Sequence, residues 1–269
     1  MSTKEPTVHG PKSAEEKRLQ GHWLLAKMGK RVLRPGGIEL TRRVLTEAAP
    51  TSTDRIVEFG PGVGQTAEIL LAVQPAQYLG VDVRDVEDNP LLDVLAGHQN
   101  ATLVNAYAQQ TGLDDGCASL VVGEAMLTMQ SDEDKLATMR EAFRILAPGG
   151  RYGLHELGFT PDTSDESAAE IQKNLSRTIK VGARPLTLAG WQKLLEEAGF
   201  TVRYSTSNEM ALLEPKRLIA DEGLGGFAKF VFNVARNKPA RERVLAMRRT
   251  FKANQRYLCA VGFVAVKPE

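Results

Sequence analysis

The stretch "RIVEFGPGVGQTAEILLA", residues 55–72, joins a short apolar run to a glycine cluster and then to a pattern with helical spacing. A strand, a tight glycine turn and a helix, followed about 20 residues later by an acid, is typical of a nucleoside-binding βαβ unit. The acid here is Asp82, which ends the apolar part of "QYLGVDV". A carboxylate in this place can accept hydrogen bonds from both ribose hydroxyls, and the glycines let the backbone approach the ligand closely.

Glu58, two residues before the first glycine, bears on the choice of nucleoside. A dinucleotide brings an anionic pyrophosphate to the helix N-terminus, where backbone N–H groups bind it. A carboxylate at Glu58 would repel that group, but it would attract the ammonium and sulfonium of S-adenosylmethionine. We therefore expect S-adenosylmethionine as the cofactor. An NAD(P)-dependent oxidoreductase is the alternative, although the chain lacks a Tyr-x-x-x-Lys dyad.

From residue 55 onward, strand-like and helix-like segments alternate, which favours parallel βαβ units. Ser131 is expected to cap the helix "DEDKLATMREAFRIL", which Pro148-Gly149-Gly150 ends, and Thr187 to cap the helix "LAGWQKLLEEAG". Two segments, 160–186 and 208–255, interrupt the alternation. We expect both to be lid-forming insertions over the open end of the sheet.

The composition limits the range of partners. The chain has 269 residues, with 34 lysines and arginines against 33 acids and a formal charge of +1, so no strong overall field attracts nucleic acid or membrane. Cys117 and Cys259 lie far apart and outside any Cys-x-x-Cys spacing, which predicts neither a disulfide framework nor a metal site. The polar start and the lack of a long apolar run predict a cytoplasmic protein without a transmembrane segment.

Four motifs in chain order, "VEFGPGVGQTA", "YLGVDV", "GLDDGCASLVVGEAM" and "EAFRILAPGGRYGLHEL", resemble those of the class I S-adenosylmethionine-dependent methyltransferases, over roughly residues 30–205. The resemblance implies a Rossmann-like α/β fold: a seven-stranded, mostly parallel sheet with helices on both faces and "YLCAVGFVAV" as an antiparallel last strand. Residues 1–50 would form N-terminal helices that cover the cofactor site. Residues 51–269 would form the methyltransferase domain with its two lid insertions.

The resemblance also assigns cofactor contacts residue by residue. Asp82 would hold the ribose, and Val83 would pack on the adenine. Tyr107 stands where the family often has an acid, so we expect it to stack on the ring while Ala108 offers its backbone N–H. The upstream "LRPGG" would fold over the methionine end. The full expected set is Glu58, Gly60, Pro61, Gly62, Gly64, Asp82, Val83, Ala106, Tyr107, Ala108, Glu124 and Ala125.

Methyl transfer is an in-line displacement, so alignment and exclusion of water can supply much of the rate. An acceptor that carries a proton needs a base, and His155 and Glu156 at the end of the fifth strand are the candidates, with Glu124 nearby. His155 fits a structural hydrogen bond equally well, and Glu156 fits a capping residue. Arg184 is a candidate clamp for an anionic substrate group, with a lid-anchoring salt bridge as the alternative.

The acceptor is expected to be a small molecule, because lids enclose such acceptors whereas nucleic-acid enzymes need an open basic cleft. The Asn-Pro-Pro-aromatic motif of amino-methylating nucleic-acid enzymes is absent, and "GEAM" stands in its place. Residues 228–257 hold nine basic residues against one acid. They predict a solvated helix face, with contact to an anionic membrane surface as the alternative. A non-catalytic cofactor-binding module stays open, and the sequence indicates no oligomeric state.

Overall fold

The structure is a computed structural model that describes residues 19–84 and 89–269. Its strands are β1 (Arg55–Phe59), β2 (Gln77–Asp82), β3 (Ala101–Asn105), β4 (Ala118–Glu124), β5 (Leu146–Phe159), β6 (Leu186–Thr187), β7 (Thr201–Glu209) and β8 (Leu258–Val266). Its helices are α2 (Gly21–Lys27), α3 (Gly37–Ala48), α4 (Gln65–Ala72), α5 (Leu91–Leu95), the 3₁₀ helix η2 (Leu127–Met129), α6 (Asp132–Ile145), α7 (Asp165–Ile179), α8 (Leu188–Glu197), α9 (Pro215–Arg236) and α10 (Lys238–Ala253).

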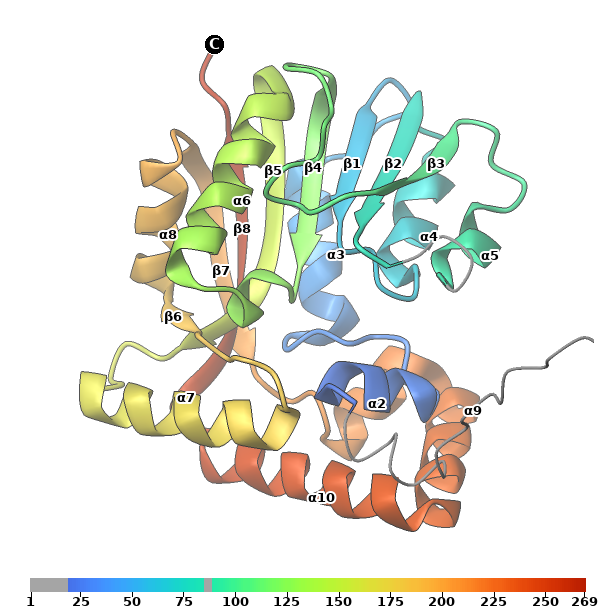
Figure 1. Cartoon of the computed structure of the whole chain (residues 1–269), viewed down its shortest axis with the longest axis vertical. Coiled ribbons are helices and arrows are strands. Elements are labelled where there is room, and N and C mark those ends of the chain that lie inside the picture. Colours follow the sequence, from blue (N-terminus) through green and yellow to red (C-terminus); the bar gives the residue numbers. More distant parts are fainter. Residues whose placement is uncertain (1–18, 85–88) are drawn as a thin grey trace, which may run out of the picture.

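The strand that leads into the glycine turn lies in the middle of the sheet, whose order is β3-β2-β1-β4-β5-β8-β7 (Figure 1). Strands β1 to β5 pair in parallel, and β8 runs antiparallel to β5 and β7. The predicted Rossmann-like, mostly parallel sheet with an antiparallel last strand is thus confirmed. The two-residue strand β6, which pairs with the end of β5, is an addition to the seven predicted strands.

Alternating side chains of the strands fill two apolar layers. On one face, Leu120 and Val122 of β4 pack with helices α3, α4 and α5. On the other face, Val121 of the same strand packs with helices α6 and α8. Successive strand residues point to opposite faces, so this strand is apolar at nearly every position, as expected for a parallel strand covered on both sides.

The predicted helix caps are confirmed. The Ser131 hydroxyl accepts a hydrogen bond from the Asp134 backbone N–H at 3.1 Å, and the Thr187 hydroxyl accepts one from Gly190 at 3.1 Å. The end of α6 differs from the prediction. The helix was expected to end at the turn Pro148-Gly149-Gly150, but it ends at Ile145, and these three residues belong to β5, which begins at Leu146. Its first residues find backbone partners at the chain's end: Gly149 donates to the Lys267 carbonyl and Lys267 donates to the Gly150 carbonyl, both at 2.9 Å.

Helices α2, α7, α9 and α10 lie together beyond the carboxyl ends of the parallel strands, and we call them the helical cap (Figure 1). They share an apolar cluster that includes Leu24, Leu25, Phe230, Val244 and Met247. The cap therefore combines α2, which precedes the sheet in the sequence, with the two segments that interrupt the β/α alternation. None of the helices in the described part of the chain has the length and apolar character needed to span a bilayer.

Candidate functional site

The glycine turn between β1 and α4 borders a hollow of about 710 Å³, which we call the loop cavity. Gly60, Gly62 and Gly64 have φ angles of 60°, 62° and 82°, a region that side chains disfavour. The cavity is lined by His22, Trp23, Arg31, Leu33, Arg34, Gly60, Pro61, Gly62, Val63, Asp82, Glu124, Ala125, Met126 and Met129.

Two of these glycines are needed for different reasons. A Cβ on Gly64 would lie 2.6 Å from Cγ2 of Val94, so this residue allows α4 to pack closely against the neighbouring helix α5. A Cβ on Gly62 would meet only a backbone oxygen at 3.9 Å. Gly62 therefore keeps the loop cavity open, whereas Gly64 serves the packing of the fold.

Asp82 ends β2 at the loop cavity, as predicted, but it has a partner that the sequence did not indicate. The Arg84 guanidinium lies 2.8 Å from its Oδ2 and also donates to the Gly62 carbonyl at 2.7 Å. The same guanidinium lies over the ring of Trp23, 4.2 Å from its centre. Arg84 thus connects the expected ribose-binding carboxylate, the glycine turn and the helical cap.

The residues expected on the adenine side lie around the ends of β2 and β3. Val83 and Tyr107 are 53% and 70% exposed, which leaves both side chains accessible to a planar ring. The Ala106 N–H already donates to the Asp82 carbonyl at 3.2 Å, and Ala108 is buried. Stacking by Tyr107 and Val83 remains our expectation for this side.

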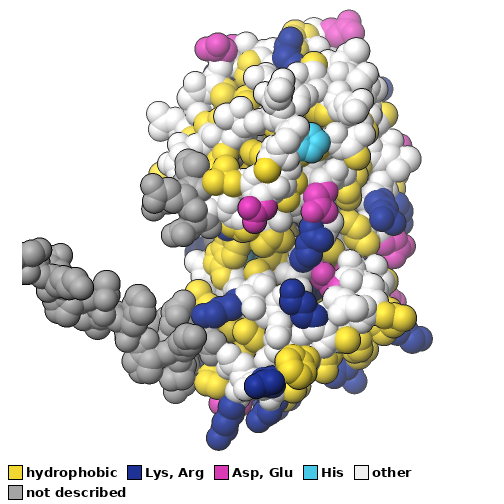
Figure 2. Space-filling model, turned by 90° about the vertical axis from the view of Figure 1, so that its right-hand side faces the viewer, with side chains coloured by type: hydrophobic (Ala, Val, Ile, Leu, Met, Phe, Trp, Pro, Cys, Tyr) yellow, Lys and Arg dark blue, Asp and Glu magenta, His cyan; other side chains and the backbone are white. Residues whose placement is uncertain are grey.

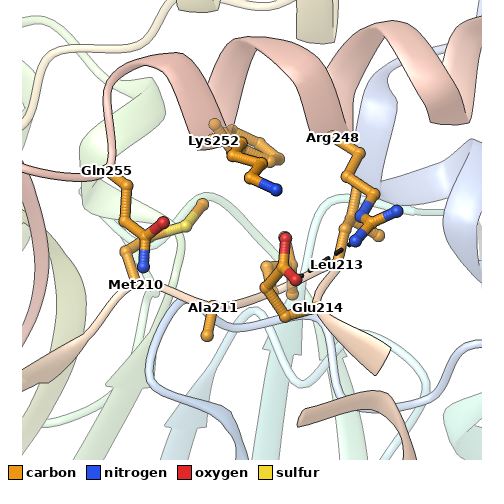
Figure 3. Close-up of a pocket in the computed structure, with 9 residues that line it drawn as sticks. Met210, Ala211, Leu213, Glu214, Arg248, Lys252 and Gln255 are labelled. Carbon is orange, nitrogen blue, oxygen red and sulfur yellow. Dashed lines mark hydrogen bonds and ion pairs between the residues drawn. The ribbon is translucent and has the colours of Figure 1, made fainter. Parts of the chain in front are cut away.

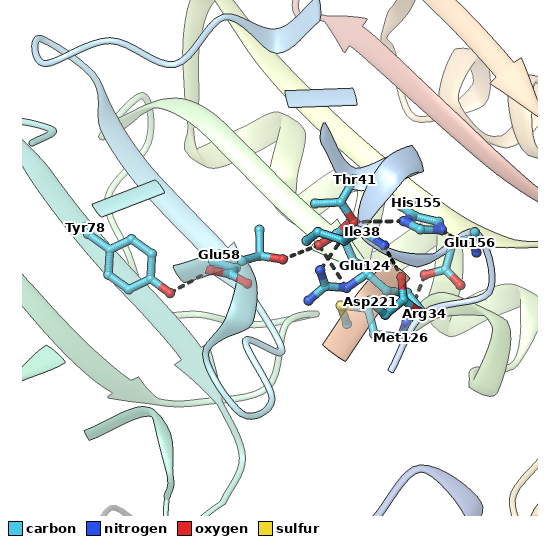
Figure 4. A network of polar contacts seen from close by, with 12 residues as sticks. Arg34, Ile38, Thr41, Glu58, Tyr78, Glu124, Met126, His155, Glu156 and Asp221 are labelled. Atoms are coloured by element: carbon cyan, nitrogen blue, oxygen red, sulfur yellow. Dashed lines mark hydrogen bonds and ion pairs between the residues drawn. The ribbon is translucent and has the colours of Figure 1, made fainter. Parts of the chain in front are cut away.

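Glu58 does not line the loop cavity. It is buried behind the glycine turn, where the Tyr78 hydroxyl donates to its Oε2 at 2.7 Å (Figure 4). Burial raises the pKa of Glu58 to about 8, and the negative charge of Glu124 adds to this effect. Without a bound cation, Glu58 is therefore mostly protonated at neutral pH. The sequence argument assumed that Glu58 is ionised and attracts the positive groups of the cofactor, so that argument has to be revised.

Glu124, at the end of β4, is a buried carboxylate that stays ionised (Figure 4). Its oxygens bind Nε of Arg34 at 3.3 Å, Nδ1 of His155 at 3.0 Å and the hydroxyls of Thr41 and Thr66. Burial acts to raise its pKa, but Arg34 and these hydrogen bonds outweigh burial and hold the pKa at about 2. Arg34 comes from the "LRPGG" segment and lines the same cavity as the glycine turn.

His155 is completely buried, and both of its ring nitrogens are in use. The Gly36 backbone N–H donates to Nε2 at 3.0 Å, so the ring proton lies on Nδ1, which donates to Glu124. Burial also lowers the pKa of His155, against the effect of Glu124. The ring is therefore neutral and has no free nitrogen for a substrate. This geometry fits the structural hydrogen bond that the sequence left open better than it fits a base: His155 holds the 34–37 segment next to Glu124.

Glu156 and Arg184 likewise have structural partners. Glu156 is fully buried and accepts hydrogen bonds from the backbone N–H groups of Met126, Leu127 and Thr128 and from the Thr128 hydroxyl, so it caps η2. Arg184 donates from its side chain to the Gln130 carbonyl at 3.3 Å. Neither geometry fits the expected base or anion clamp, and the alternatives of a capping and an anchoring residue describe them better.

A second hollow of about 690 Å³, which we call the apolar cavity, lies beside the first. His22, Leu33, Ala125 and Met129 line both. Its far side is formed by the helical cap, through residues such as Leu175 and Ile179 of α7 and Met247 and Phe251 of α10. Sequence reasoning missed His22 and Trp23, because in "HWLLAK" they resembled ordinary members of an amphipathic helix.

A third hollow, of about 230 Å³, lies between α10 and the segment after β7 (Figure 3). Glu214 and Arg248 form an ion pair of 3.2 Å across it. It is separate from the glycine turn and too small for a nucleoside, so we assign it no ligand.

A family model described as a methyltransferase domain matches residues 30–205. The chain is a class I methyltransferase. Like other members of this superfamily it uses S-adenosylmethionine. The methyltransferase is also 32% identical over 253 residues to an uncharacterized protein from Haemophilus influenzae, over 91% of this chain and 96% of that one.

Solved structures share the fold of this methyltransferase. One is the Haemonchus contortus phosphoethanolamine N-methyltransferase 2 in complex with phosphomonomethylethanolamine and S-adenosylhomocysteine, with a TM-score of 0.69 and 18% identity over 93% of this chain and 57% of that one. Another is the cyclase SpnF, with a TM-score of 0.64 and 17% identity over 86% of this chain and 80% of that one.

The residues of the loop cavity fit the cofactor of a methyltransferase. The positive φ angles of the turn keep side chains out of the cavity, Asp82 offers a buried carboxylate at its edge, and Tyr107 offers an exposed ring nearby. The NAD(P)-dependent oxidoreductase considered from the sequence is not supported, because the matching family is that of the methyltransferases.

Proposed function

We propose that the protein methylates a small molecule held between the sheet and the helical cap. The observation that carries the proposal is the apolar cavity, which shares one wall with the loop cavity and is covered by α7 and α10. A nucleic acid needs an open basic groove, whereas a small acceptor fits an enclosed site beside the cofactor. The phosphoethanolamine enzyme that shares this fold also has a small-molecule ligand.

The residues of the loop cavity are the proposed cofactor site. Pro61 and Gly62 shape its floor, Asp82 holds the ribose, and Glu124 and Ala125 face the methionine end. Val83 and Tyr107 pack on the adenine, next to Ala106 and Ala108, while Glu58 and Gly64 support the turn from behind. In this proposal the helices before residue 50 and the lid insertions form the cover of the site.

The bound cofactor supplies a methyl group on a positively charged sulfur, which departs as a neutral thioether. The chain's own residues have to align the acceptor and exclude water. Ala125 marks the meeting point of the two cavities with an unusual φ of 53°, held by a hydrogen bond from its N–H to the His155 carbonyl at 2.7 Å. Glu124, the residue before Ala125, binds Arg34 and His155. These contacts hold the backbone at Ala125 and so stabilise the wall that the two cavities share.

We further propose that the protein acts in the cytoplasm, which its two free cysteines support. The basic residues of 228–257 lie on α9 and α10, apart from Arg256 in the turn that follows. In Figure 2, lysine and arginine side chains on the lower part of the molecule are dispersed among acidic and apolar ones. This dispersion favours a solvated surface over a membrane-binding patch.

The proposal is tested by following a labelled methyl group. The purified protein is incubated with methyl-tritiated S-adenosylmethionine and a cell extract, and the products are then separated by ultrafiltration. The filtrate also holds the unreacted labelled cofactor, so its components are then separated by chromatography. We expect label in a small molecule that is neither S-adenosylmethionine nor a product of incubation without the protein. Transferred label found only in the retained proteins and nucleic acids would contradict the proposal. The Asp82→Ala variant is the control, because it should lose the labelling.

A further inference from the structure

We propose that the apolar cavity takes an uncharged, mostly apolar acceptor and that His22 binds the hydroxyl or amine that receives the methyl group. The inference rests on the proposed function and names the substrate class of the same site. It assigns a substrate-side residue that neither the sequence motifs nor the family match provides.

The position of the cavity supports this inference. The loop cavity and the apolar cavity share His22, Leu33, Ala125 and Met129. A molecule in the apolar cavity can therefore reach the methionine end of a cofactor bound at the glycine turn. In-line displacement requires the nucleophile and the sulfonium methyl to meet across this shared wall.

The lining of the apolar cavity decides which acceptors it can bind. Within residues 19–84 and 89–269, the side chains that line it are aliphatic, aromatic or thioether groups apart from Thr128 and His22. Carboxylates, guanidinium groups and ammonium groups are missing from this set. A phosphate or carboxylate on the acceptor would lose its hydration there without gaining a counter-charge, which disfavours charged acceptors. Methionines such as Met129, Met210 and Met247 adapt easily to an irregular apolar shape.

His22 is the polar group that this cavity leaves available. The Thr128 hydroxyl is already committed to the Glu156 carboxylate at 2.6 Å. The His22 ring stacks at a tilt on Trp23, with centres 4.8 Å apart, and its nitrogens make no hydrogen bond with the part of the chain that the structure describes. Burial, together with the nearby charge of Arg84, lowers the pKa of His22 to about 4. The imidazole is therefore neutral at physiological pH and has a lone pair to accept a proton.

The proposed step balances in atoms and charge. The acceptor's oxygen or nitrogen lone pair forms the new bond to the methyl carbon, and the carbon–sulfur bond breaks with its electron pair going to sulfur. The proton of the acceptor's O–H or N–H group passes to an imidazole nitrogen of His22 and then to water. The positive charge that begins on the sulfonium is thus carried away as the proton.

N-phenyl-1-naphthylamine is a suitable probe, because it is uncharged, fluorescent in apolar surroundings and carries one N–H donor. We expect it to bind the wild-type protein, and we expect phosphoethanolamine not to displace it. Ala183→Phe fills the apolar cavity and should weaken probe binding at least tenfold. Ala253→Phe makes the same change at an exposed position of α10 and should leave binding unchanged. Thermal melting confirms that each variant folds.

A second comparison isolates His22. N-methyl-N-phenyl-1-naphthylamine lacks the N–H donor, so it cannot donate to the imidazole. His22→Leu should weaken binding of the N–H probe about fivefold relative to its effect on the N-methyl probe, the value of one hydrogen bond. Equal effects on the two probes would overturn the role of His22, since a purely structural role affects both alike.

Calorimetric titration with S-adenosylhomocysteine separates this inference from the proposed function. Binding of S-adenosylhomocysteine together with no binding of the naphthylamine probe would overturn the apolar-acceptor inference alone. Failure of S-adenosylhomocysteine to bind would instead contradict the cofactor site on which both proposals depend.

Discussion

Two buried glutamates on neighbouring strands show how strongly surroundings set charge in this molecule. Glu58 on β1 has the Tyr78 hydroxyl as its hydrogen-bond partner, and its pKa is about 8. Glu124 on β4 has the Arg34 guanidinium, the His155 ring and two hydroxyls, and its pKa is about 2. At neutral pH one of these two glutamates is therefore protonated and the other ionised, and the pair avoids repulsion between two buried charges.

The raised pKa of Glu58 has a cost in stability. Between pH 4.5 and about 8 the unfolded chain ionises this residue while the folded protein keeps it protonated, so stability falls as pH rises through this window. Glu58→Gln removes this loss. We expect the variant to be more stable than the wild type at pH 7 by roughly 3 kcal/mol, and the difference to vanish near pH 4.5.

Thermal unfolding at a series of pH values measures this difference. Glu47→Gln, a matched change at an exposed position of α3, is the control and should follow the wild type. A constant difference between Glu58→Gln and the wild type across the pH range would contradict the assignment of a raised pKa to Glu58.

Asp82 is expected to bind both ribose hydroxyls. Asp82→Ala should therefore weaken binding of S-adenosylhomocysteine by at least tenfold, or about 1.4 kcal/mol. Calorimetric titration measures the change, and Asp93→Ala at an exposed position of α5 is the control. An unchanged affinity would refute the assignment of Asp82 to the ribose.

At the scale of elements, the glycine turn offers two substitutions of the same kind with different results. Gly64→Ala should destabilise the fold, because the new Cβ overlaps Val94 on α5. Gly62→Ala should retain more stability and mainly weaken binding of S-adenosylhomocysteine, since its Cβ meets open space at the loop cavity. Melting temperatures and calorimetry of both variants distinguish the roles. Equal losses of stability would contradict them.

The sequence predicted most of the elements but fewer of the contacts at the site. Periodicity and caps such as Ser131 and Thr187 are local signals, so they located the helices α6 and α8. The glycine turn and Asp82 have a fixed spacing, so they were also visible. The partners Arg84, Trp23 and His22 were not, because their roles depend on how the helical cap meets the sheet.

His155 shows why a position at a strand end is not sufficient to predict chemistry. It lies on β5, as predicted, opposite the last residue of β4, although β5 continues to Phe159. The backbone of Gly36, more than a hundred residues earlier, occupies the nitrogen that a substrate would need. Only the fold brings these two residues together. A buried histidine can be recognised from its local pattern, whereas its hydrogen-bond partner cannot.

At the scale of the whole molecule, a buried ion pair binds the segment that precedes α3 to α9. Nζ of Lys30 lies 3.3 Å from Asp221 and 3.5 Å from Glu222, and all three side chains are almost fully buried. Asp221 also accepts a hydrogen bond from the Ile38 N–H at 3.0 Å. The segment between these contacts carries Arg31 and Arg34, which line the loop cavity.

Removal of Asp221 should therefore affect both stability and cofactor binding. Asp221→Ala leaves Lys30 with one acidic partner and the Ile38 N–H without its acceptor, at a cost of roughly 2–4 kcal/mol. We expect faster proteolysis within residues 28–38 and weaker binding of S-adenosylhomocysteine. Limited proteolysis and calorimetry measure the two effects.

Glu214→Ala is the control for this experiment. Its ion pair with Arg248 joins two partly exposed side chains, so its loss should cost less than about 1 kcal/mol. If Asp221→Ala behaved like Glu214→Ala in both measurements, the buried pair would not be what fastens the cap.

The position of β8 has a consequence for synthesis on the ribosome. This strand is the last of the sheet in chain order, yet it lies between β5 and β7 and hydrogen-bonds to both. Until residues 258–266 emerge, β5 has an unpaired edge and β7 has no place in the sheet. A nascent chain can therefore build the half of the sheet that carries the glycine turn before residues 258–266 emerge, but the other half has to wait for them. A stop codon just before residue 258 would remove the strand that joins β5 to β7, although the other strands would all be present.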